Sequence, residues 1–206
     1  MAGPGLWRAK APVVLASTSR VRRTLLEGAG IPVEVVSSGV DERVIEASLG
    51  PGIEATELAM RLACAKAEAV AGSYPDRIVI GADQVLEFEG ACLGKPGTPD
   101  DARRQIARLA GRIHFLRSAV AIVVHGRLHA VEVESAKLTM RDLDAAAIAA
   151  YVEAAGESAT RSAGGYEIEG LGIHLFSDVE GEHSTILGLP LMPVLAALRR
   201  LDCLAV

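Results

Sequence analysis

An acidic residue directly after an apolar run is the feature of this sequence best suited to chemistry. The segment Gly81-Ala82-Asp83-Gln84 follows Ile78-Val79-Ile80. If a strand ends there, the Asp83 carboxylate is held at a fixed point on the rim of a sheet. Such a carboxylate could bind a metal ion or act as general base for a water molecule. An ordinary turn carboxylate is the alternative interpretation of the same residues.

Cationic and hydroxyl side chains lie close to other expected strands. Lys95 stands between Gly94 and Pro96, and the run Ser17-Thr18-Ser19-Arg20-Val21-Arg22-Arg23 follows the apolar residues 13–16. Hydroxyl and guanidinium groups at a turn from strand to helix are suited to a bound phosphate. One acid together with several anion-binding cations therefore suggests phosphate-ester chemistry.

A lysine and a second acid could contribute to the same site. Lys66 follows Leu58 and Leu62 at helical spacing, so it shares their apolar face and points inward or at the rim of a cleft. It could bind phosphate, or its stem could cover apolar surface while the amine stays in water. Glu42 follows Asp41 and a Ser-Ser-Gly loop, and is either exposed to solvent or a second metal-binding acid.

The composition restricts the class of protein. The chain has 206 residues, of which 50% are hydrophobic, and a net charge of −5. These values predict one domain or two small lobes with a packed core, and they argue against general nucleic-acid binding. Cys64, Cys92 and Cys203 are widely spaced and in no CxxC pattern, so we expect buried thiols in a reducing compartment, neither disulfides nor zinc ligands.

Targeting signals are not evident in the sequence. Residues 1–10 lack the apolar core of a signal peptide. The longest apolar runs, such as residues 119–124, are far shorter than the roughly 20 residues that cross a bilayer. We therefore expect a cytoplasmic protein with no membrane partner.

Apolar periodicity and helix-ending residues predict the order of the elements. Residues 1–11 are expected to form a flexible tail and residues 12–206 a single domain. Strands are expected at 12–16, 33–36, 77–82, 112–124 and 128–140, with a hairpin of 85–88 and 91–93. Helices are expected at 20–29, 54–72, 98–109, 142–154 and 191–201. Because strands and helices mostly alternate, the fold class is α/β or α+β.

Seven segments, taken together, resemble the Maf family of nucleoside triphosphate pyrophosphatases. They occur in the family's order and extend over residues 12–200, nearly the whole chain. The segments are Leu15-Ala16-Ser17-Thr18-Ser19 with Arg22-Arg23, Val40-Asp41-Glu42, Ala65-Lys66-Ala67, Gly81-Ala82-Asp83-Gln84, Gly94-Lys95-Pro96, Gly165-Tyr166-Glu167-Ile168-Glu169-Gly170 and Ile186-Leu187-Gly188-Leu189-Pro190.

The resemblance implies a mixed α/β (α+β) fold of the type found in Maf proteins and inosine triphosphatases. In that fold, two lobes with a central mixed sheet surround a deep cleft, and a second copy of the chain can be a partner. It also implies hydrolysis of a nucleoside triphosphate to the monophosphate and diphosphate with Mg²⁺ or Mn²⁺, in the service of nucleotide-pool cleansing. A non-catalytic nucleotide-binding regulator of cell division and a phosphatase that releases inorganic phosphate are the alternatives.

The resemblance also implies roles for individual residues. Asp83 would be the proton acceptor and, with Glu42, a metal ligand. The substrate's triphosphate would be bound by Ser17, Arg22, Lys66 and Lys95. Because cations and a metal surround Asp83, we expect its carboxylate to be ionised.

Three positions bear on the choice of base in this family, and here they are Val21, Gln84 and Glu169. Gln84 and Glu169 are similar to the branch that acts on 7-methyl-GTP, so we expect a guanine-type substrate, with a dTTP/UTP pyrophosphatase as the alternative. A carboxylate suits the N–H donors of guanine and would attract a methylated, cationic ring. That branch tends to carry Trp at the position of Val21. A second departure is Arg117-Ser118-Ala119 after His114, where many members have a Thr-Gly pair, and we expect it to lie away from the proposed acid.

Overall fold

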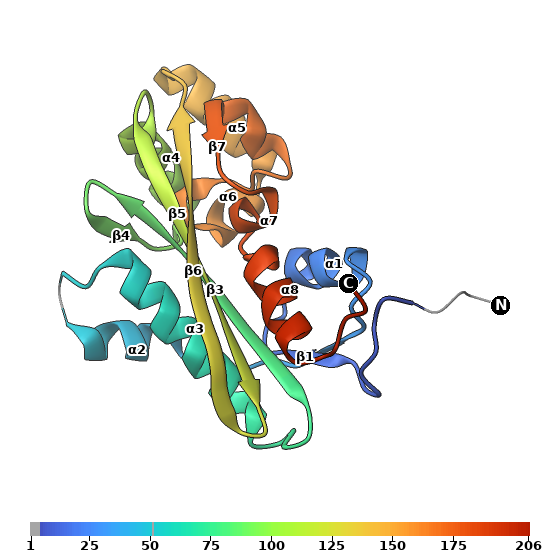
Figure 1. Ribbon diagram of the computed structural model, residues 1–206. Coiled ribbons are helices and arrows are strands. Elements are labelled where there is room, and N and C mark those ends of the chain that lie inside the picture. The colour runs from blue at the N-terminus through green and yellow to red at the C-terminus, as the bar shows by residue number, and fades with distance from the viewer. Residues whose placement is uncertain (1–4, 51) are drawn as a thin grey trace.

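A mixed β-sheet organises the protein, whose computed structural model describes residues 5–50 and 52–206. Its strand order is β2-β1-β3-β5-β6-β7, and β4 pairs with β3 outside this path (Figure 1). β1 is parallel to its two neighbours, β2 and β3, whereas the pairs β3–β4, β3–β5, β5–β6 and β6–β7 are antiparallel. The strands are β1 (Val13–Leu15), β2 (Val33–Val35), β3 (Ile78–Phe88), β4 (Ala91–Leu93), β5 (Ile113–Val124), β6 (Arg127–Met140) and β7 (Phe176–Glu180).

Several helices begin where the sequence provides capping side chains. Ser19, Thr98 and Asp144 accept hydrogen bonds from the first-turn amides of α1, α4 and α5, which satisfies groups that a helix start otherwise leaves unpaired. The helices are α1 (Arg20–Gly28), α2 (Glu42–Leu49), α3 (Ala55–Ala71), α4 (Pro99–Leu109), α5 (Ala145–Ala155), α6 (Ser158–Arg161), α7 (His183–Ile186) and α8 (Leu191–Arg200). Two 3₁₀ turns, η1 (Ala163–Gly165) and η2 (Leu171–Leu175), complete the order.

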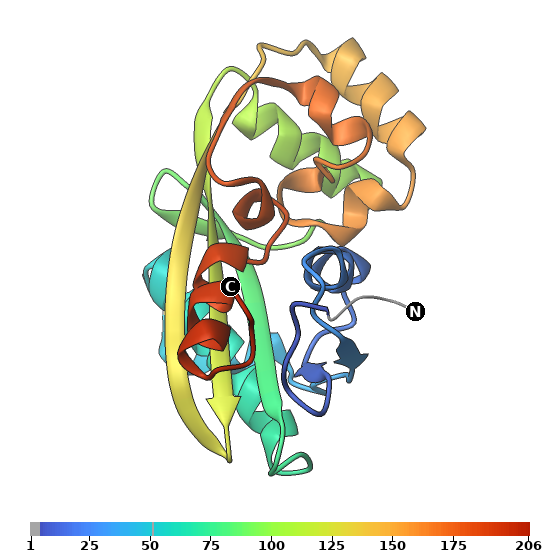
Figure 2. The same ribbon diagram turned by 45° about the vertical axis from the view of Figure 1, so that its right-hand side comes forward.

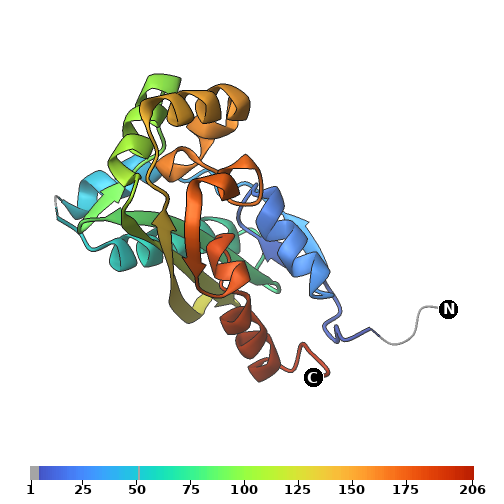
Figure 3. The ribbon, with the colours of Figure 1, turned by 90° about the horizontal axis from the view of Figure 1, so that it is seen from above.

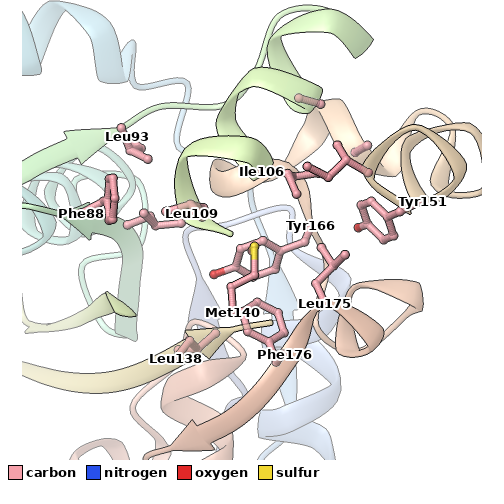
Figure 4. Packing of buried hydrophobic residues seen from close by; sticks show 14 of the residues in the cluster. Phe88, Leu93, Ile106, Leu109, Leu138, Met140, Tyr151, Tyr166, Leu175 and Phe176 are labelled. Carbon is pink, nitrogen blue, oxygen red and sulfur yellow. The ribbon is translucent and has the colours of Figure 1, made fainter. Parts of the chain in front are cut away.

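Different helices cover the two faces of the long strands. α3 packs on one face through its small apolar side chains, and α1 and α8 pack on the other (Figure 2). At the far end of the sheet, α4 and α5 lie next to each other over the ends of β3, β5 and β6 (Figure 3). The buried cluster beneath α4 and α5 is separate from the clusters on the two faces of the long strands. It includes Tyr166, Phe176 and Met140, which pack together (Figure 4). The mixed α/β class is therefore confirmed.

The expected end of the strand at Asp83 is wrong. β3 continues for 11 residues from Ile78 to Phe88, so Gly81-Ala82-Asp83-Gln84 lies within it. The predicted first strand of the hairpin, 85–88, is its second half. The physical reason is the long antiparallel ladder with β5, which extends from Ile78↔Val124 to Glu87↔Phe115 and holds β3 extended past its glycine.

Most other elements agree with the sequence prediction, but the short elements α2, α6, α7 and β7 and the two 3₁₀ turns were not predicted. α2 begins at Glu42, the last residue of the expected polar loop 37–42, because Asp41 caps its N-terminus by accepting a hydrogen bond from the Arg43 amide. β7 and the short helix α7 form in the segment after the glycine-rich residues. These elements are short, so a periodic pattern hardly develops in them.

The N-terminal segment makes backbone contacts where a flexible tail was expected. Trp7 forms a bridge with Leu204, and the Arg8 amide donates to the Cys203 carbonyl at 2.9 Å. Residues 1–4 of the expected tail lie outside the described residues. The three cysteines are free thiols; Cys203 is buried, while Cys64 and Cys92 are half-buried. No helix in the described part of the chain combines the length and apolarity needed to span a bilayer.

Candidate active site

The candidate site lies along an open stretch of one edge of β3. On that edge β1 pairs with β3 as far as Ile80, and β4 pairs with it from Leu86 onward. Between these points, residues 81–85 have no strand partner on this side within the described chain, while β5 pairs with the opposite edge. A cavity of about 980 Å³ opens at this gap. This volume is within the usual range for small-molecule sites.

Every site residue expected from the sequence lines this cavity. Ser17 follows β1 on one side of the gap and Lys95 follows β4 on the other, which explains how residues so far apart in sequence meet. The set is Ser17, Val21, Arg22, Glu42, Lys66, Asp83, Gln84, Lys95 and Glu169.

Neighbouring residues of β3 supply opposite sides of the cavity. Side chains alternate along a strand, so Asp83 points toward α3, and Gln84 points toward the other face. The open edge connects the two faces, because no strand separates them there. Asp83 is thus a mid-strand residue that nevertheless lies beside a ligand-sized cavity.

Lys66 joins the two acids of the site. Its ammonium group donates a hydrogen bond to Asp83 and lies 2.6 Å from Oε1 of Glu42. Lys66 and Asp83 are buried, with exposed fractions of 7% and 6%, whereas the Glu42 side chain is 45% exposed. The inward orientation expected for Lys66 is confirmed.

The two carboxylates respond differently to this environment. Burial raises the pKa of Asp83 above its ordinary value, and the charges of Lys66 and Arg22 only partly oppose it. Burial also disfavours the ionised form of Glu42, but the hydrogen bond and charge of Lys66, with the charges of Lys95 and Arg22, outweigh it and lower the pKa. We expected the cations to keep Asp83 ionised, but desolvation favours its protonated form and raises its pKa.

Arg22, expected to bind the triphosphate, donates several hydrogen bonds to other residues of the protein. Its Nε donates to the Gly188 carbonyl at 2.8 Å, and its Nη1 donates to the Ala82 carbonyl at 2.7 Å and to Ser17 Oγ at 3.3 Å. The Ala82 carbonyl belongs to the open stretch of β3. Arg22 therefore satisfies part of the strand edge as well as lining the cavity. Arg23 instead pairs with Glu27 in an exposed ion pair.

Glu169 is presented by a tight turn. The Glu167 carbonyl accepts from the amides of Gly170 and Gly172, both at 3.1 Å. A Cβ on Gly172 would lie 2.4 Å from that carbonyl oxygen, so only glycine fits there. The turn holds the exposed Glu169 at the cavity wall, beside the carboxylate-bearing Glu167.

Several lining residues were missed from the sequence. Ser37 and Ser38 follow β2 and reach the cavity because the carboxyl ends of neighbouring parallel strands share one edge of a sheet. Parallel pairing of the predicted strands could have identified them. Arg161 and Ser162, at the end of α6, also line the cavity, and no local pattern indicates them.

A divalent cation would find oxygen donors from Glu42 and Asp83. Each uses one oxygen for Lys66, and its second oxygen accepts no hydrogen bond from the described residues. Mg²⁺ commonly binds one or two carboxylates and completes its shell with water and substrate phosphates. The described residues contain no cluster of three or more His, Cys, Asp or Glu side chains that could hold a metal. The free oxygens of Glu42 and Asp83 therefore suit a cation whose other ligands are water and substrate oxygens.

Comparisons with known proteins agree in one family. A family model described as "Maf-like protein" matches residues 12–201. The chain is 50% identical over 194 residues to a Nitrobacter winogradskyi protein named nucleoside triphosphate pyrophosphatase, covering 94% of this chain and 96% of that protein. It is 42% identical over 193 residues to a Brucella abortus protein named 7-methyl-GTP pyrophosphatase, covering 93% and 97%.

A likeness to solved structures is weaker. A nucleoside-triphosphatase, or dITP/XTP pyrophosphatase, from Mycobacterium abscessus aligns with 65% of this chain and 76% of that chain, with a TM-score of 0.38 and 17% identity. The family therefore follows from the sequence matches.

Proposed function

This chain belongs to the Maf family, and we propose that it hydrolyses a nucleoside triphosphate to the monophosphate and diphosphate. The observation that carries the proposal is the buried Asp83 carboxylate held by Lys66 beside a cavity of about 980 Å³. A carboxylate with a raised pKa in a cleft of cations is suited to accept a proton. The pyrophosphatase name of the 50% identical relative supports the same activity.

In the proposed mechanism, Asp83 takes a proton from a water molecule that attacks the α-phosphorus. The bond between the α-phosphorus and the oxygen that bridges to the β-phosphorus breaks, and diphosphate leaves. Lys66 keeps the Asp83 carboxylate in place, and Lys95, with the hydroxyl groups of residues 17–19, binds the phosphate oxygens. Such a transition state needs positioning and charge stabilisation more than covalent help. Glu42 and Asp83 would hold Mg²⁺ or Mn²⁺, which would neutralise phosphate charge.

We further propose a guanine-type base, 7-methylated or otherwise modified. Lys66, Lys95 and the 17–19 turn supply phosphate-binding groups to the cavity, whereas Glu167 and Glu169 supply carboxylates. Carboxylates pair well with the N–H edge of guanine and with a cationic ring. The 42% identical relative named 7-methyl-GTP pyrophosphatase supports this choice. Nucleotide-pool cleansing in the cytoplasm, by a monomer or homodimer, is the setting that we infer.

The test is a panel of canonical and modified nucleoside triphosphates with Mg²⁺ or Mn²⁺, followed by identification of the products. We expect monophosphate and diphosphate in equal amounts, with highest kcat/KM for guanine-type substrates. Release of inorganic phosphate would indicate a phosphatase instead. Tight binding without turnover would indicate a regulator, and a preference for dTTP or UTP would overturn the choice of base.

A further inference from the structure

Residues 185–188, of which Ile186, Leu187 and Gly188 line the cavity, are held from behind by a buried polar network; we call them the 185–188 wall. The Thr185 carbonyl accepts three hydrogen bonds, from Ser118 Oγ at 2.7 Å, Gln84 Nε2 at 3.1 Å and the Gly188 amide at 3.0 Å. Ser118 and Thr185 have no exposed surface. Because such buried bonds are shielded from water, losing the Ser118 hydroxyl removes one of the two side-chain donors that fix this carbonyl and leaves Gln84 and the Gly188 amide to hold it.

The side-chain amide nitrogen of Gln84 lies within hydrogen-bonding distance of three oxygens of this network. Besides Thr185, Nε2 lies 3.0 Å from the Ile186 carbonyl and 2.9 Å from Ser118 Oγ. An amide nitrogen has two hydrogens, so these three oxygens already exceed its donor capacity. Gln84 lines the cavity, but its donors are directed at the protein and not toward a base.

The segment Arg117-Ser118-Ala119 passes beside the proposed acid, contrary to the expectation from the sequence. In the β3–β5 ladder, Ser118 is directly opposite Gln84, and Ala119 is opposite Asp83. The antiparallel register brings together residues that are 34 positions apart in the chain. Ser118 itself does not line the cavity, whereas Ile186, Leu187 and Gly188 do.

The wall held by Ser118 is suited to the nucleoside part of a ligand. It offers the apolar side chains of Ile186 and Leu187, while Lys66 is held by Asp83 and Lys95 follows β4. Arg22 Nε fixes the other end of the wall through the Gly188 carbonyl. The wall is therefore attached at one end through Arg22 and at the other through Ser118 and Gln84.

We propose that Ser118 is a positioning residue that, together with Gln84, holds the 185–188 wall and thereby sets affinity for the nucleoside. This inference rests on the proposed function, because it assigns the wall to that substrate. Ser118→Ala should raise KM for the preferred nucleoside triphosphate about tenfold, the effect of losing one useful hydrogen bond, and leave kcat within about twofold. Inhibition by inorganic tripolyphosphate, which has no nucleoside, should keep its wild-type constant.

Amide hydrogen exchange provides a readout that needs no substrate. In Ser118→Ala, the amides of Gly188 and Leu189, which bond to Thr185 and Ser184, should exchange at least tenfold faster, while the α3 amides keep their wild-type rates. Ser135→Ala, on the neighbouring strand β6 with its hydroxyl bonded to Arg117, is the matched control and should change neither measurement. Gln84→Met repeats the test with the other member of the pair.

The outcomes separate the two proposals. Equal weakening of tripolyphosphate and nucleotide binding, or unchanged exchange at Gly188 and Leu189 in both variants, would overturn the role of Ser118. A wild-type protein that hydrolyses no triphosphate would instead refute the proposed function, and the exchange rates would still decide whether Ser118 holds the wall.

Discussion

Gly81 of β3 packs so closely against Ala63 of α3 that a Cβ on Gly81 would lie 2.2 Å from the Ala63 carbonyl oxygen and 2.7 Å from the Ala67 amide nitrogen. Both of these obstacles are backbone atoms, which cannot move aside as a side chain does. Lys66 lies on α3 between these two alanines in sequence, and Asp83 is two residues from Gly81 on the same face of β3. The glycine therefore sets the approach that allows Lys66 to reach Asp83.

Gly81→Ala should separate α3 from the sheet and misplace Lys66. We expect a loss of about 1–3 kcal/mol in the free energy of unfolding, as for other overpacked cores, and a fall of about 100-fold in kcat/KM, because small displacements of catalytic groups are costly. Urea unfolding and steady-state kinetics measure the two effects. Gly72→Ala, at the end of α3 with no atom within 4 Å of the added carbon, is the control and should match the wild type.

Asp83→Asn should remove turnover and preserve the fold. The amide cannot take a proton from water, and general bases contribute roughly 10²–10⁴-fold, so we expect kcat to fall by about a thousandfold. Lys66 keeps its ion pair with Glu42, which limits the effect on stability as judged by circular dichroism and thermal melting. Asp178→Asn, an exposed residue of β7, should leave the rate unchanged. Diphosphate release at the wild-type rate by Asp83→Asn would show that another group is the base.

The acid limb of the pH profile should report the burial of Asp83. Because burial raises the pKa of this carboxyl, kcat/KM should fall with decreasing pH at a midpoint above the ordinary aspartate value of 3.8. Lys66 is the strongest opposing charge, so Lys66→Met should move the midpoint to higher pH, in addition to lowering the rate. A midpoint that does not move in Lys66→Met would contradict the assignment of this limb to Asp83.

The sequence predicts the members of the site better than their geometry. The Leu58, Leu62 and Lys66 spacing correctly indicates an inward lysine, since a helix imposes its own period. The pattern Gly81-Ala82-Asp83 predicts a strand that ends at residue 82, whereas β3 continues to Phe88 and Gly81 allows the backbone of α3 to approach it. The contact between Ser118 and Gln84 depends on the register of a ladder, and no local pattern encodes that register.

Glu169→Gln should reduce discrimination in favour of guanine-type substrates. The amide retains an acceptor but loses the charge, so kcat/KM for 7-methyl-GTP should fall by about tenfold or more, and that for UTP by less than threefold. Competition between the two substrates in one reaction measures the ratio directly. Glu153→Gln, on an exposed residue of α5 that does not line the cavity, is the control. An equal fall for both substrates would exclude Glu169 as a base-recognising residue.

His114 should make the stability of the protein depend on pH. It is fully buried on β5, with Nε2 2.7 Å from the Tyr166 hydroxyl, while Nδ1 has no partner among the described residues. Burial lowers the pKa of His114 from 6.5 to about 4. Between these values the unfolded chain binds a proton that the folded protein does not, so the free energy of unfolding decreases as pH falls through this window.

The contribution of His114 can be isolated by substitution. The buried neutral His114 should lower the free energy of unfolding by about 1.4 kcal/mol for each pH unit between pH 6.5 and pH 4, or about 3 kcal/mol in all. Above about pH 7.5 it should have no effect. Urea unfolding at several pH values gives the slope for the wild type and for His114→Gln, which cannot bind the proton and should have a shallower slope. His129→Gln, on an exposed residue of β6, should retain the wild-type slope. Parallel curves for the wild type and His114→Gln would mean that the folded protein admits the proton as readily as the unfolded chain.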